Sequence, residues 1–338
     1  MLSEHSEIRV RMLGHTGTAL KEGDFASSIS AAYARRLMLG LNGPHDAFRL
    51  VNSEGDGLPG LIVDHLGQVL TVQITTAPMA RRQEDIFAAL LGLFPEHAIL
   101  RIPPPSFIAA KEKFEFAFGW QGKTGPDTVE VLEGGVRFVI PTAQVQKTGH
   151  YADMRIHRQW IGGIARGKRV LDAYSYSGGF GLHALAGGAS QVVCVDSSEA
   201  ACAAVRANAD ANSAQLEVVC SKVDDFLRSA SDRGHLYDIV VLDPPKLAPS
   251  RKHVAGALKV YESLTLQALR VIERGLLCLG SCSEAIGLPE LERILGAAQA
   301  RSGRRLSVVY TGTQSPDHPY PAAMSEGRYL TFLACTVE

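Results

Sequence analysis

The sequence lacks the marks of a secreted, membrane-bound or disulfide-stabilised protein. Residues 1–7 include no basic segment followed by an apolar one, and the chain has no run of about 18 apolar residues. Its cysteines form no CxxC pair and no Cys/His spacing of a zinc site, so we expect buried free thiols and no bound metal. These absences predict a soluble, cytoplasmic protein. The cysteines are Cys194, Cys202, Cys220, Cys278, Cys282 and Cys335.

An excess of charge of either sign is also missing. The 338 residues include 34 basic and 35 acidic ones, for a net charge of −1. A protein that binds nucleic acid over its whole surface is usually clearly basic, so any RNA contact must come from local patches. The length and the hydrophobic content of 46% indicate a globular chain of about two domains.

The first 135 residues show short apolar runs and glycine turns. Within residues 1–45 we expect a strand over 8–13 and a helix over 25–39. Residues 46–135 predict a small α+β domain that ends in a β-hairpin, because Glu133-Gly134-Gly135 separates two short strand-like runs. The other expected elements of this domain are strands at 48–51, 60–64 and 69–75 and a helix at 81–94.

Strands and helices alternate over the rest of the chain, from Lys168 onward. This alternation indicates a largely parallel sheet covered by helices. The last two strands follow one another without a helix, so the final strand must run antiparallel. Seven strands with this ending are typical of the Rossmann-like sheet of class I methyltransferases and not of dehydrogenases, and we assign residues 136–338 to such an α/β domain. The strands are expected at 169–173, 191–195, 216–220, 237–242, 276–280, 306–311 and 329–336.

The first turn between a strand and a helix carries an acidic residue and glycines. The turn reads Asp172-Ala173-Tyr174-Ser175-Tyr176-Ser177-Gly178-Gly179. Glycines let a ligand approach the backbone, and a helix N-terminus offers unpaired N–H groups. The loop lacks the G-x-G-x-x-G order that seats a pyrophosphate, whereas an acidic residue at its start suits a cationic sulfonium ligand. By itself the pattern is equally compatible with a simple tight turn.

Acidic residues also follow the second and third strands. Asp196 ends the second strand roughly 18 residues after Gly178, close to the spacing at which a carboxylate accepts hydrogen bonds from ribose hydroxyls. A solvated surface Asp is the other interpretation. Asp224 is a candidate acceptor for the adenine amino group, and we prefer it to Asp225, although helix N-capping would explain either residue.

The fourth strand ends in the most specific motif of the chain, Asp243-Pro244-Pro245-Lys246. The two prolines stiffen the backbone, so the carboxylate is held at the carboxyl edge of the sheet. Methyltransferases that act on planar nitrogenous bases use Asp/Asn-Pro-Pro motifs there to hold the base beside the methyl group. A proline-rich loop with a surface Asp is the alternative.

The fifth strand ends in Ser281-Cys282-Ser283, at the same edge as Asp243. Cytosine C5 is too weak a nucleophile to accept a methyl group unaided. A thiolate that adds to C6 makes C5 enamine-like, and later elimination restores the ring. A lone cysteine at a strand end is more often structural, but the upstream Asp-Pro-Pro favours Cys282 as a nucleophile and Asp243 as the group that binds the N3/N4 edge of cytosine.

Together these motifs resemble those of the bacterial 23S ribosomal RNA (cytosine-C5)-methyltransferases that carry an N-terminal PUA domain. The resemblance extends from about residue 6 to the C-terminus. It implies methyl transfer from S-adenosylmethionine (AdoMet) to C5 of a cytosine in large-subunit ribosomal RNA, through a covalent Cys–C6 adduct. The stretches that carry it are 52–64, 147–155, 174–180, 243–246, 281–283 and 326–330.

The resemblance implies a role for individual residues. Cys282 and Asp243 would be catalytic. The residues implied to line the cofactor site are Tyr174, Ser175, Gly178, Asp196, Asp224, Asp243 and Arg155. Those expected to border the base or to contact RNA are Lys147, Tyr151, Pro244, Pro245, Lys246, Arg251 and Lys252.

The chain departs from the family at two places. It begins where the PUA domain would be nearly complete, so we expect residues 1–45 to be a remnant of that module. RNA contact would then depend on patches that are equally compatible with solvated surface, namely Arg251-Lys252-His253, Arg81-Arg82 or Arg35-Arg36. Lys246 follows the prolines where other RNA cytosine-C5 enzymes have a second cysteine, so the sequence does not identify the base that removes the C5 proton.

Three other functions stay open at this stage. A guanine N-methyltransferase acting on RNA would use Asp-Pro-Pro without a nucleophile. A non-catalytic RNA-binding or assembly factor would keep only the fold, although the intact Gly178-Gly179, Asp196 and Asp243 argue against this. A small-molecule methyltransferase is compatible with the near-neutral charge.

Overall fold

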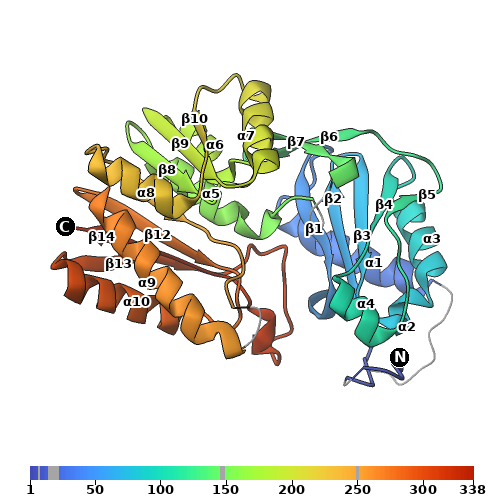
Figure 1. Cartoon of the computed structure of the whole chain (residues 1–338). Coiled ribbons are helices and arrows are strands. Elements are labelled where there is room, and N and C mark those ends of the chain that lie inside the picture. Colours follow the sequence, from blue (N-terminus) through green and yellow to red (C-terminus); the bar gives the residue numbers. More distant parts are fainter. Residues whose placement is uncertain (7, 14–22, 145–148, 249–250) are drawn as a thin grey trace. The chain divides into compact units, whose positions relative to one another are not determined.

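The computed structural model describes residues 1–6, 8–13, 23–144, 149–248 and 251–338, which form two compact units (Figure 1). Unit 1 consists of Met1–Gly135, Val139–Asp153 and Ser315–Gly327. Unit 2 consists of Val136–Phe138, Met154–Gln314 and Arg328–Glu338. The sequence predicts domain boundaries at residues 45 and 135, and these boundaries stay a prediction.

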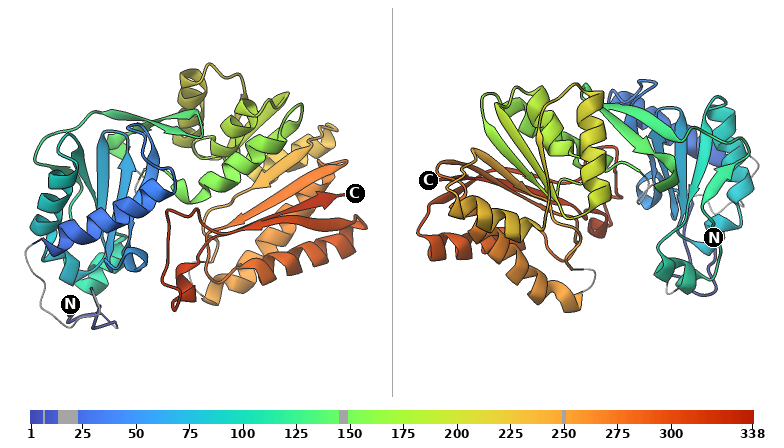
Figure 2. Two further views of the ribbon diagram at one scale, coloured as in Figure 1. Left: turned by 180° about the vertical axis from the view of Figure 1, so that it is seen from behind. Right: turned by 45° about the horizontal axis from the view of Figure 1, so that its top comes forward.

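Unit 1 is built on a five-stranded sheet in the order β1-β2-β3-β4-β5. β3 and β4 are parallel, and the other neighbours are antiparallel. The helices α1 and α3 pack against each other (Figure 2). Their apolar side chains join the core of this sheet. The strands are β1 (Ala47–Asn52), β2 (Leu61–Leu66), β3 (Val69–Ile74), β4 (Ala98–Ile102) and β5 (Gly119–Gln121), and the helices are α1 (Asp24–Met38), α2 (Ala77–Ala80), α3 (Gln83–Leu93) and α4 (Ser106–Glu112).

The predicted helices over 25–39 and 81–94, the three strands between 48 and 75 and the hairpin are confirmed. The hairpin is formed by β6 (Thr128–Glu133) and β7 (Val136–Pro141). The expected strand over 8–13 is wrong, because that stretch makes only an isolated bridge between Leu2 and Val10. The elements α2, β4, α4 and β5 were not expected; each is short, and a short apolar run carries little periodicity.

A buried ion pair lies within unit 1. Arg36, which is 1% exposed, donates to both carboxylate oxygens of Asp56 at 2.6 and 2.7 Å, and Arg35 donates to the same carboxylate. Burial alone would raise the pKa of Asp56, but the hydrogen bonds and charge of Arg36 outweigh it and lower the pKa. The expectation that Arg35-Arg36 forms an exposed basic patch is therefore wrong for Arg36.

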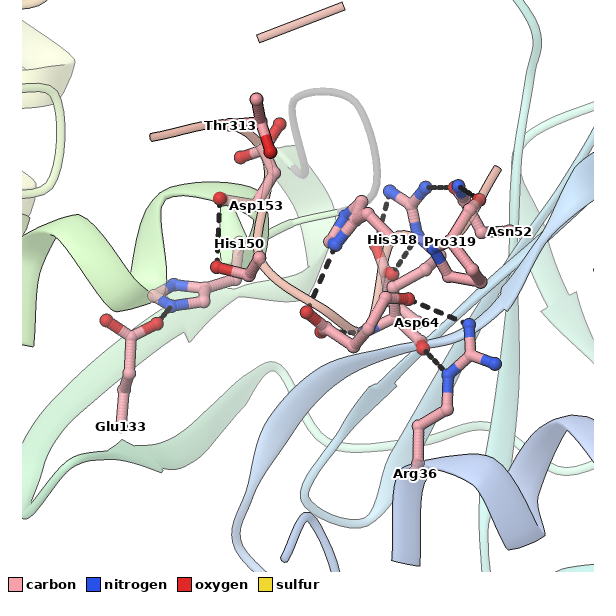
Figure 3. A network of polar contacts seen from close by, with 12 residues as sticks. Arg36, Asn52, Asp64, Glu133, His150, Asp153, Thr313, His318 and Pro319 are labelled. Carbon is pink, nitrogen blue, oxygen red and sulfur yellow. Dashed lines mark hydrogen bonds and ion pairs between the residues drawn. The ribbon is translucent and has the colours of Figure 1, made fainter. Parts of the chain in front are cut away.

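The segment Ser315–Gly327, which connects two strands of unit 2, packs in unit 1 (Figure 3). The carbonyl oxygen of Asp317 accepts from Arg36 at 2.8 Å, and its carboxylate accepts from the backbone N–H of Arg49 at 2.9 Å. The side chain of Asn52 donates to the carbonyl oxygen of Pro319 at 2.8 Å. Residues far apart in the sequence thus complete one buried polar network.

The strands of unit 2 form one sheet in the order β10-β9-β8-β11-β12-β14-β13. The strands from β8 to β12 pair in parallel, whereas β14 runs antiparallel between β12 and β13. This confirms the predicted seven-stranded α/β sheet and its antiparallel last strand. The strands are β8 (Arg169–Ala173), β9 (Gln191–Asp196), β10 (Glu217–Cys220), β11 (Ile239–Leu242), β12 (Gly275–Ser281), β13 (Leu306–Gly312) and β14 (Thr331–Val337).

Helices cover both faces of this sheet (Figure 1). Alternate strand residues point into two separate apolar cores, one shared with α8, α9 and α10 and the other with α5, α6 and α7. Both cores are built largely from buried Val, Leu, Ile and Ala. The helices are α5 (Arg155–Ile164), α6 (Gly179–Ala186), α7 (Glu199–Ala211), α8 (Val223–Asp232), α9 (Val254–Arg270) and α10 (Leu288–Ser302).

All six cysteines are free thiols. Four are buried as expected, but Cys220 is exposed and Cys282 is half-buried, so the expectation of buried thiols is wrong for these two. Among the helices that the structure describes, none is long and apolar enough to cross a membrane.

The buried ion pair makes a stability prediction. Replacing Arg36 with Met leaves the Asp56 carboxylate buried without its main partner, so the free energy of unfolding should fall by about 3 kcal/mol. Arg35→Met is the matched control, because the Arg35 side chain is 46% exposed and should contribute less than about 1 kcal/mol. Urea unfolding followed by circular dichroism measures both, and equal losses would contradict the assignment.

Candidate active site

Four parallel strands of unit 2 end side by side at one edge of the sheet. Their register aligns Ala173 of β8 with Val195 of β9 and with Leu242 of β11, and it aligns Leu242 with Leu279 of β12. Because the carboxyl ends of parallel strands meet at the same edge, the loops that follow begin next to one another. The predicted site residues Tyr174, Asp196, Asp243 and Cys282 all lie in or beside these loops.

The loop after β8 is held in an unusual backbone conformation. Tyr174 and Tyr176 have φ values of 65° and 48°, a region that non-glycine residues rarely adopt. The backbone N–H of Tyr174 donates to the carbonyl oxygen of Val195 at 2.9 Å, and that of Tyr176 donates to the Asp196 carboxylate at 3.0 Å. The strained loop is therefore fixed by the end of the neighbouring strand β9.

Close packing explains two glycines of the motif. A Cβ atom at Gly179 would lie 2.6 Å from Cδ of Arg158, and one at Gly181 would lie 2.6 Å from Sγ of Cys194. Gly178, with a φ of 78°, caps the N-terminus of α6. The glycines thus let α6 start directly against β8 and β9, with its first N–H groups at the strand ends.

Asp172 is fully buried beneath this loop. One carboxylate oxygen accepts from the backbone N–H of Gly181 at 2.9 Å, and the other has no hydrogen-bond partner among the described residues. Burial raises the pKa of Asp172 to about 7, against the opposing effects of the Gly181 hydrogen bond and the Arg158 charge. The hydroxyl of Ser175, also buried, likewise lacks a partner among these residues. Unsatisfied buried polar atoms of this kind fit a site that binds a polar, positively charged ligand.

Three predicted cofactor residues lie within electrostatic reach of one another. Burial raises the pKa of Tyr174 to about 12, and the negative charges of Asp224 and Asp196 add to this effect. The carboxylate of Asp224 also accepts from the side-chain amide of Gln267 on α9 at 3.4 Å. Asp196 accepts two backbone hydrogen bonds, which leaves further lone pairs for ligand hydroxyls.

Asp225 differs from its neighbour Asp224. Its carboxylate pairs with Arg228 one helical turn later, at 3.2 Å. The N-cap of α8 is Lys222 and no side chain caps this helix, so the alternative that Asp224 or Asp225 serves as an N-cap is wrong.

Asp243 and Cys282 follow adjacent strands. The backbone N–H of Asp243 donates to the carbonyl oxygen of Ala173, and its carboxylate lies so close to Gly280 that a Cβ there would collide with it. Cys282, two residues after Gly280, is half-buried. Pro244 is buried, whereas Pro245 and Lys246 are exposed. The geometry brings the predicted base-binding carboxylate and the predicted nucleophile to neighbouring strand ends.

Tyr261 is a buried residue of this region that the sequence did not single out. It lies on α9 and donates to the carbonyl oxygen of Gly280 at 2.9 Å. Burial raises its pKa, and the nearby ionisable groups of Asp243, Cys282 and Tyr174 raise it further. No local motif marks it, because it comes from a helix that precedes β12. Only its inward position on an amphipathic helix could have pointed to it.

The roles of the remaining predicted residues stay predictions. Arg155 is buried at the start of α5, which packs against α6. Tyr151 belongs to unit 1, and Lys147 lies outside the described residues. Arg251 begins a short 3-10 turn in which Lys252 is exposed. Among the described residues, no group of three or more His, Cys, Asp or Glu is arranged to hold a metal ion.

Comparisons with known proteins find relatives over most of the chain. Residues 97–286 match the model of a family described as S-adenosylmethionine-dependent methyltransferase. Ribosomal RNA large subunit methyltransferase I of Shigella boydii is 34% identical over 297 residues, which are 86% of this chain and 75% of that protein. The protein of the same name from Photobacterium profundum is 32% identical over 342 residues, 99% of this chain and 86% of its own.

A solved structure has the same fold. SMU.776, described as a methyltransferase and crystallised with SAH, superposes with a TM-score of 0.83 over 95% of this chain and 83% of its own, at 22% sequence identity. At this identity the likeness concerns the fold.

The contrast between Asp224 and Asp225 can be tested directly. Asp224→Asn should weaken AdoMet binding about tenfold or more, because it removes the charge of a carboxylate placed to accept a hydrogen bond. Asp225→Asn is the matched control and should change the dissociation constant less than twofold, since that carboxylate is paired with Arg228. Isothermal titration calorimetry measures both, and the reverse order would show that the two roles are interchanged.

The raised pKa of Asp172 predicts a pH dependence of AdoMet binding. A carboxyl with a pKa of about 7 carries a proton at pH 6 and loses it by pH 8, and a cationic ligand favours the ionised form. AdoMet affinity should therefore rise about tenfold between pH 6 and pH 8. Calorimetric titrations of the wild type and of Asp172→Asn separate this effect from titration of AdoMet itself. A rise of the same size in the variant would rule out Asp172 as its source.

Proposed function

Because the chain belongs to the S-adenosylmethionine-dependent methyltransferase family, we propose that it methylates C5 of a cytosine in large-subunit ribosomal RNA, with Cys282 as the nucleophile. The RNA substrate is supported by the names of relatives that are 32–34% identical over most of the chain. The observation that carries the C5 chemistry is the placement of Asp243 and Cys282 at the ends of the adjacent strands β11 and β12.

The residues of the sheet edge fit the cofactor. When bound, AdoMet supplies an electrophilic methyl group on a sulfonium centre. In this proposal Asp196 accepts hydrogen bonds from ribose hydroxyls and Asp224 accepts one from the adenine amino group. Asp172 and Ser175 offer buried polar atoms that lack partners among the described residues, and the carboxylate of Asp172 favours a cationic ligand.

The proposed reaction uses the thiolate of Cys282. A bond forms between Sγ and C6 of the cytosine, and the electron pair of the C5–C6 double bond makes C5 the nucleophilic atom. After C5 has been methylated, its proton leaves to a base, the Sγ–C6 bond breaks, and the ring and the thiolate are restored. Asp243 holds the N3/N4 edge of the base during these steps.

RNA must present the base in an accessible form. A cytosine within a duplex would have to leave the stack, so a single-stranded or locally opened segment is the favoured substrate. The exposed Lys246, beside Asp243, and the exposed Lys252 of the following turn are the proposed phosphate contacts. A cytoplasmic location is part of this proposal, because it follows from the substrate.

The nucleophile is tested with a pair of cysteine variants. Cys282→Ala should lower the rate of 5-methylcytidine formation by at least about 100-fold, because the covalent route is lost. Cys220→Ala, which removes an exposed thiol of the same unit, should keep the wild-type rate. Each protein is incubated with AdoMet and unmodified large-subunit ribosomal RNA, and the digested nucleosides are identified by mass spectrometry.

A second substrate separates the alternatives. RNA that carries 5-fluorocytidine has no C5 proton to remove, so the adduct should persist with the wild type and with Cys220→Ala but not with Cys282→Ala. Methylguanosine as the product of normal RNA would indicate a guanine N-methyltransferase. Absence of any methylated nucleoside, together with absence of AdoMet binding, would indicate a non-catalytic factor.

A further inference from the structure

Buried hydrogen bonds hold the strand end that carries Cys282. The hydroxyl of Tyr261 donates to the carbonyl oxygen of Gly280 at 2.9 Å. The backbone N–H of Ser283 donates to the hydroxyl of Ser281 at 3.3 Å. The strand that leads to Cys282 is thus tied to one tyrosine of helix α9, and the two residues beside Cys282 are tied to each other.

The residues that make these hydrogen bonds are inaccessible to solvent. Tyr261 is 1% exposed, Ser281 is fully buried and Ser283 is 2% exposed, whereas Cys282 between the two serines is half-buried. The proposed nucleophile is therefore the accessible residue of a short segment, and the serine on either side of it is buried. The Ser281 hydroxyl therefore has a structural role, because it accepts from the backbone N–H of Ser283, whereas the Ser283 hydroxyl is buried without a hydrogen-bond partner among the described residues.

Tyr261 is suited to be a permanent hydrogen-bond donor. Burial raises its pKa well above 10, and the nearby groups Asp243 and Cys282 raise it further. The phenol therefore keeps its proton near neutral pH, and its hydrogen bond to the Gly280 carbonyl oxygen holds the strand end.

We propose that Tyr261 is a positioning residue, which acts with Ser281 to fix the backbone around Cys282 so that the thiolate meets C6 of the cytosine held at Asp243. The inference rests on the proposed function, because it assigns the network a purpose in covalent catalysis. A nucleophile must be held within a fraction of an ångström of its productive position, and a loosened strand end lowers the rate of attack.

The test is the removal of single oxygen atoms from this network. Tyr261→Phe and Ser281→Ala should each lower kcat for 5-methylcytidine formation about tenfold, the effect of one lost hydrogen bond on the positioning of the thiolate. The rate of adduct formation with 5-fluorocytidine RNA should fall by the same factor. The dissociation constant for AdoMet should stay within twofold of the wild-type value, and the shape of the pH–rate profile should not change.

Tyr237→Phe is the matched control. Tyr237 is 4% exposed and lies in the same apolar core as Tyr261, but it precedes β11 and therefore belongs to the opposite edge of the sheet. The Tyr237→Phe variant loses the same hydroxyl group but leaves the Cys282 segment unchanged, so its kcat should be unaffected. In the double variant Tyr261→Phe/Ser281→Ala, kcat should be close to that of the slower single variant, because both changes loosen the same short segment around Cys282.

The outcomes separate this inference from the proposed function. If Cys282→Ala is inactive but Tyr261→Phe keeps the wild-type kcat, the positioning role is wrong and the C5 mechanism stands. If Tyr237→Phe shows the same loss of kcat, or if Tyr261→Phe weakens AdoMet binding instead, Tyr261 contributes only to general packing. A pH–rate profile that loses one limb in Tyr261→Phe would show acid–base catalysis instead. Formation of 5-methylcytidine by Cys282→Ala would overturn both proposals.

Discussion

The candidate site depends on the parallel hydrogen bonding of β8, β9, β11 and β12. Their register places four carboxyl ends in one row, so that the Gly loop, Asp196, Asp243 and Cys282 all emerge at the same edge. A shift of one residue in any of these strands would turn its buried side chains to the opposite face. The two apolar cores prevent such a shift, because alternate residues of each strand pack against the helices on opposite faces of the sheet. Catalytic geometry is thus a consequence of core packing.

The same edge concentrates features that oppose stability. A carboxyl group is buried at Asp172 and two tyrosines have positive φ values, each of which costs about 1–3 kcal/mol in general. The carboxylate of Asp196 and the N–H groups at the start of α6 hold these features in place before any ligand binds. A site built in this way is preorganised, since the fold itself sets the positions of the groups at this edge.

Unit 1 shows how a polar network can join distant parts of a chain. Arg36 and Asp317 are 281 positions apart, yet the carbonyl oxygen of Asp317 accepts from the guanidinium that also neutralises Asp56. Closing a loop of this length carries an entropic cost, which the buried hydrogen bonds and packing of unit 1 offset. The network also removes Arg36 from the set of residues available to RNA. In unit 2, the exposed Lys246 and Lys252 stay available for that role.

The sequence alone determined the alternation of strands and helices after Lys168, the antiparallel last strand and the order of the motifs, because these follow from local periodicity and from the steric properties of Gly and Pro. It made Cys282 a candidate nucleophile, because the cysteine ends the strand that follows the Asp-Pro-Pro strand, and this role stays a prediction. It preferred Asp224 to Asp225 but did not show the contact of Asp224 with Gln267, it placed Arg36 on the surface, and it passed over Tyr261. The partners of Asp224, Arg36 and Tyr261 come from other helices, strands or loops, which are close only after the chain has folded. Burial and hydrogen-bond partners are decided by tertiary packing, and the residue type at one position carries almost no information about them.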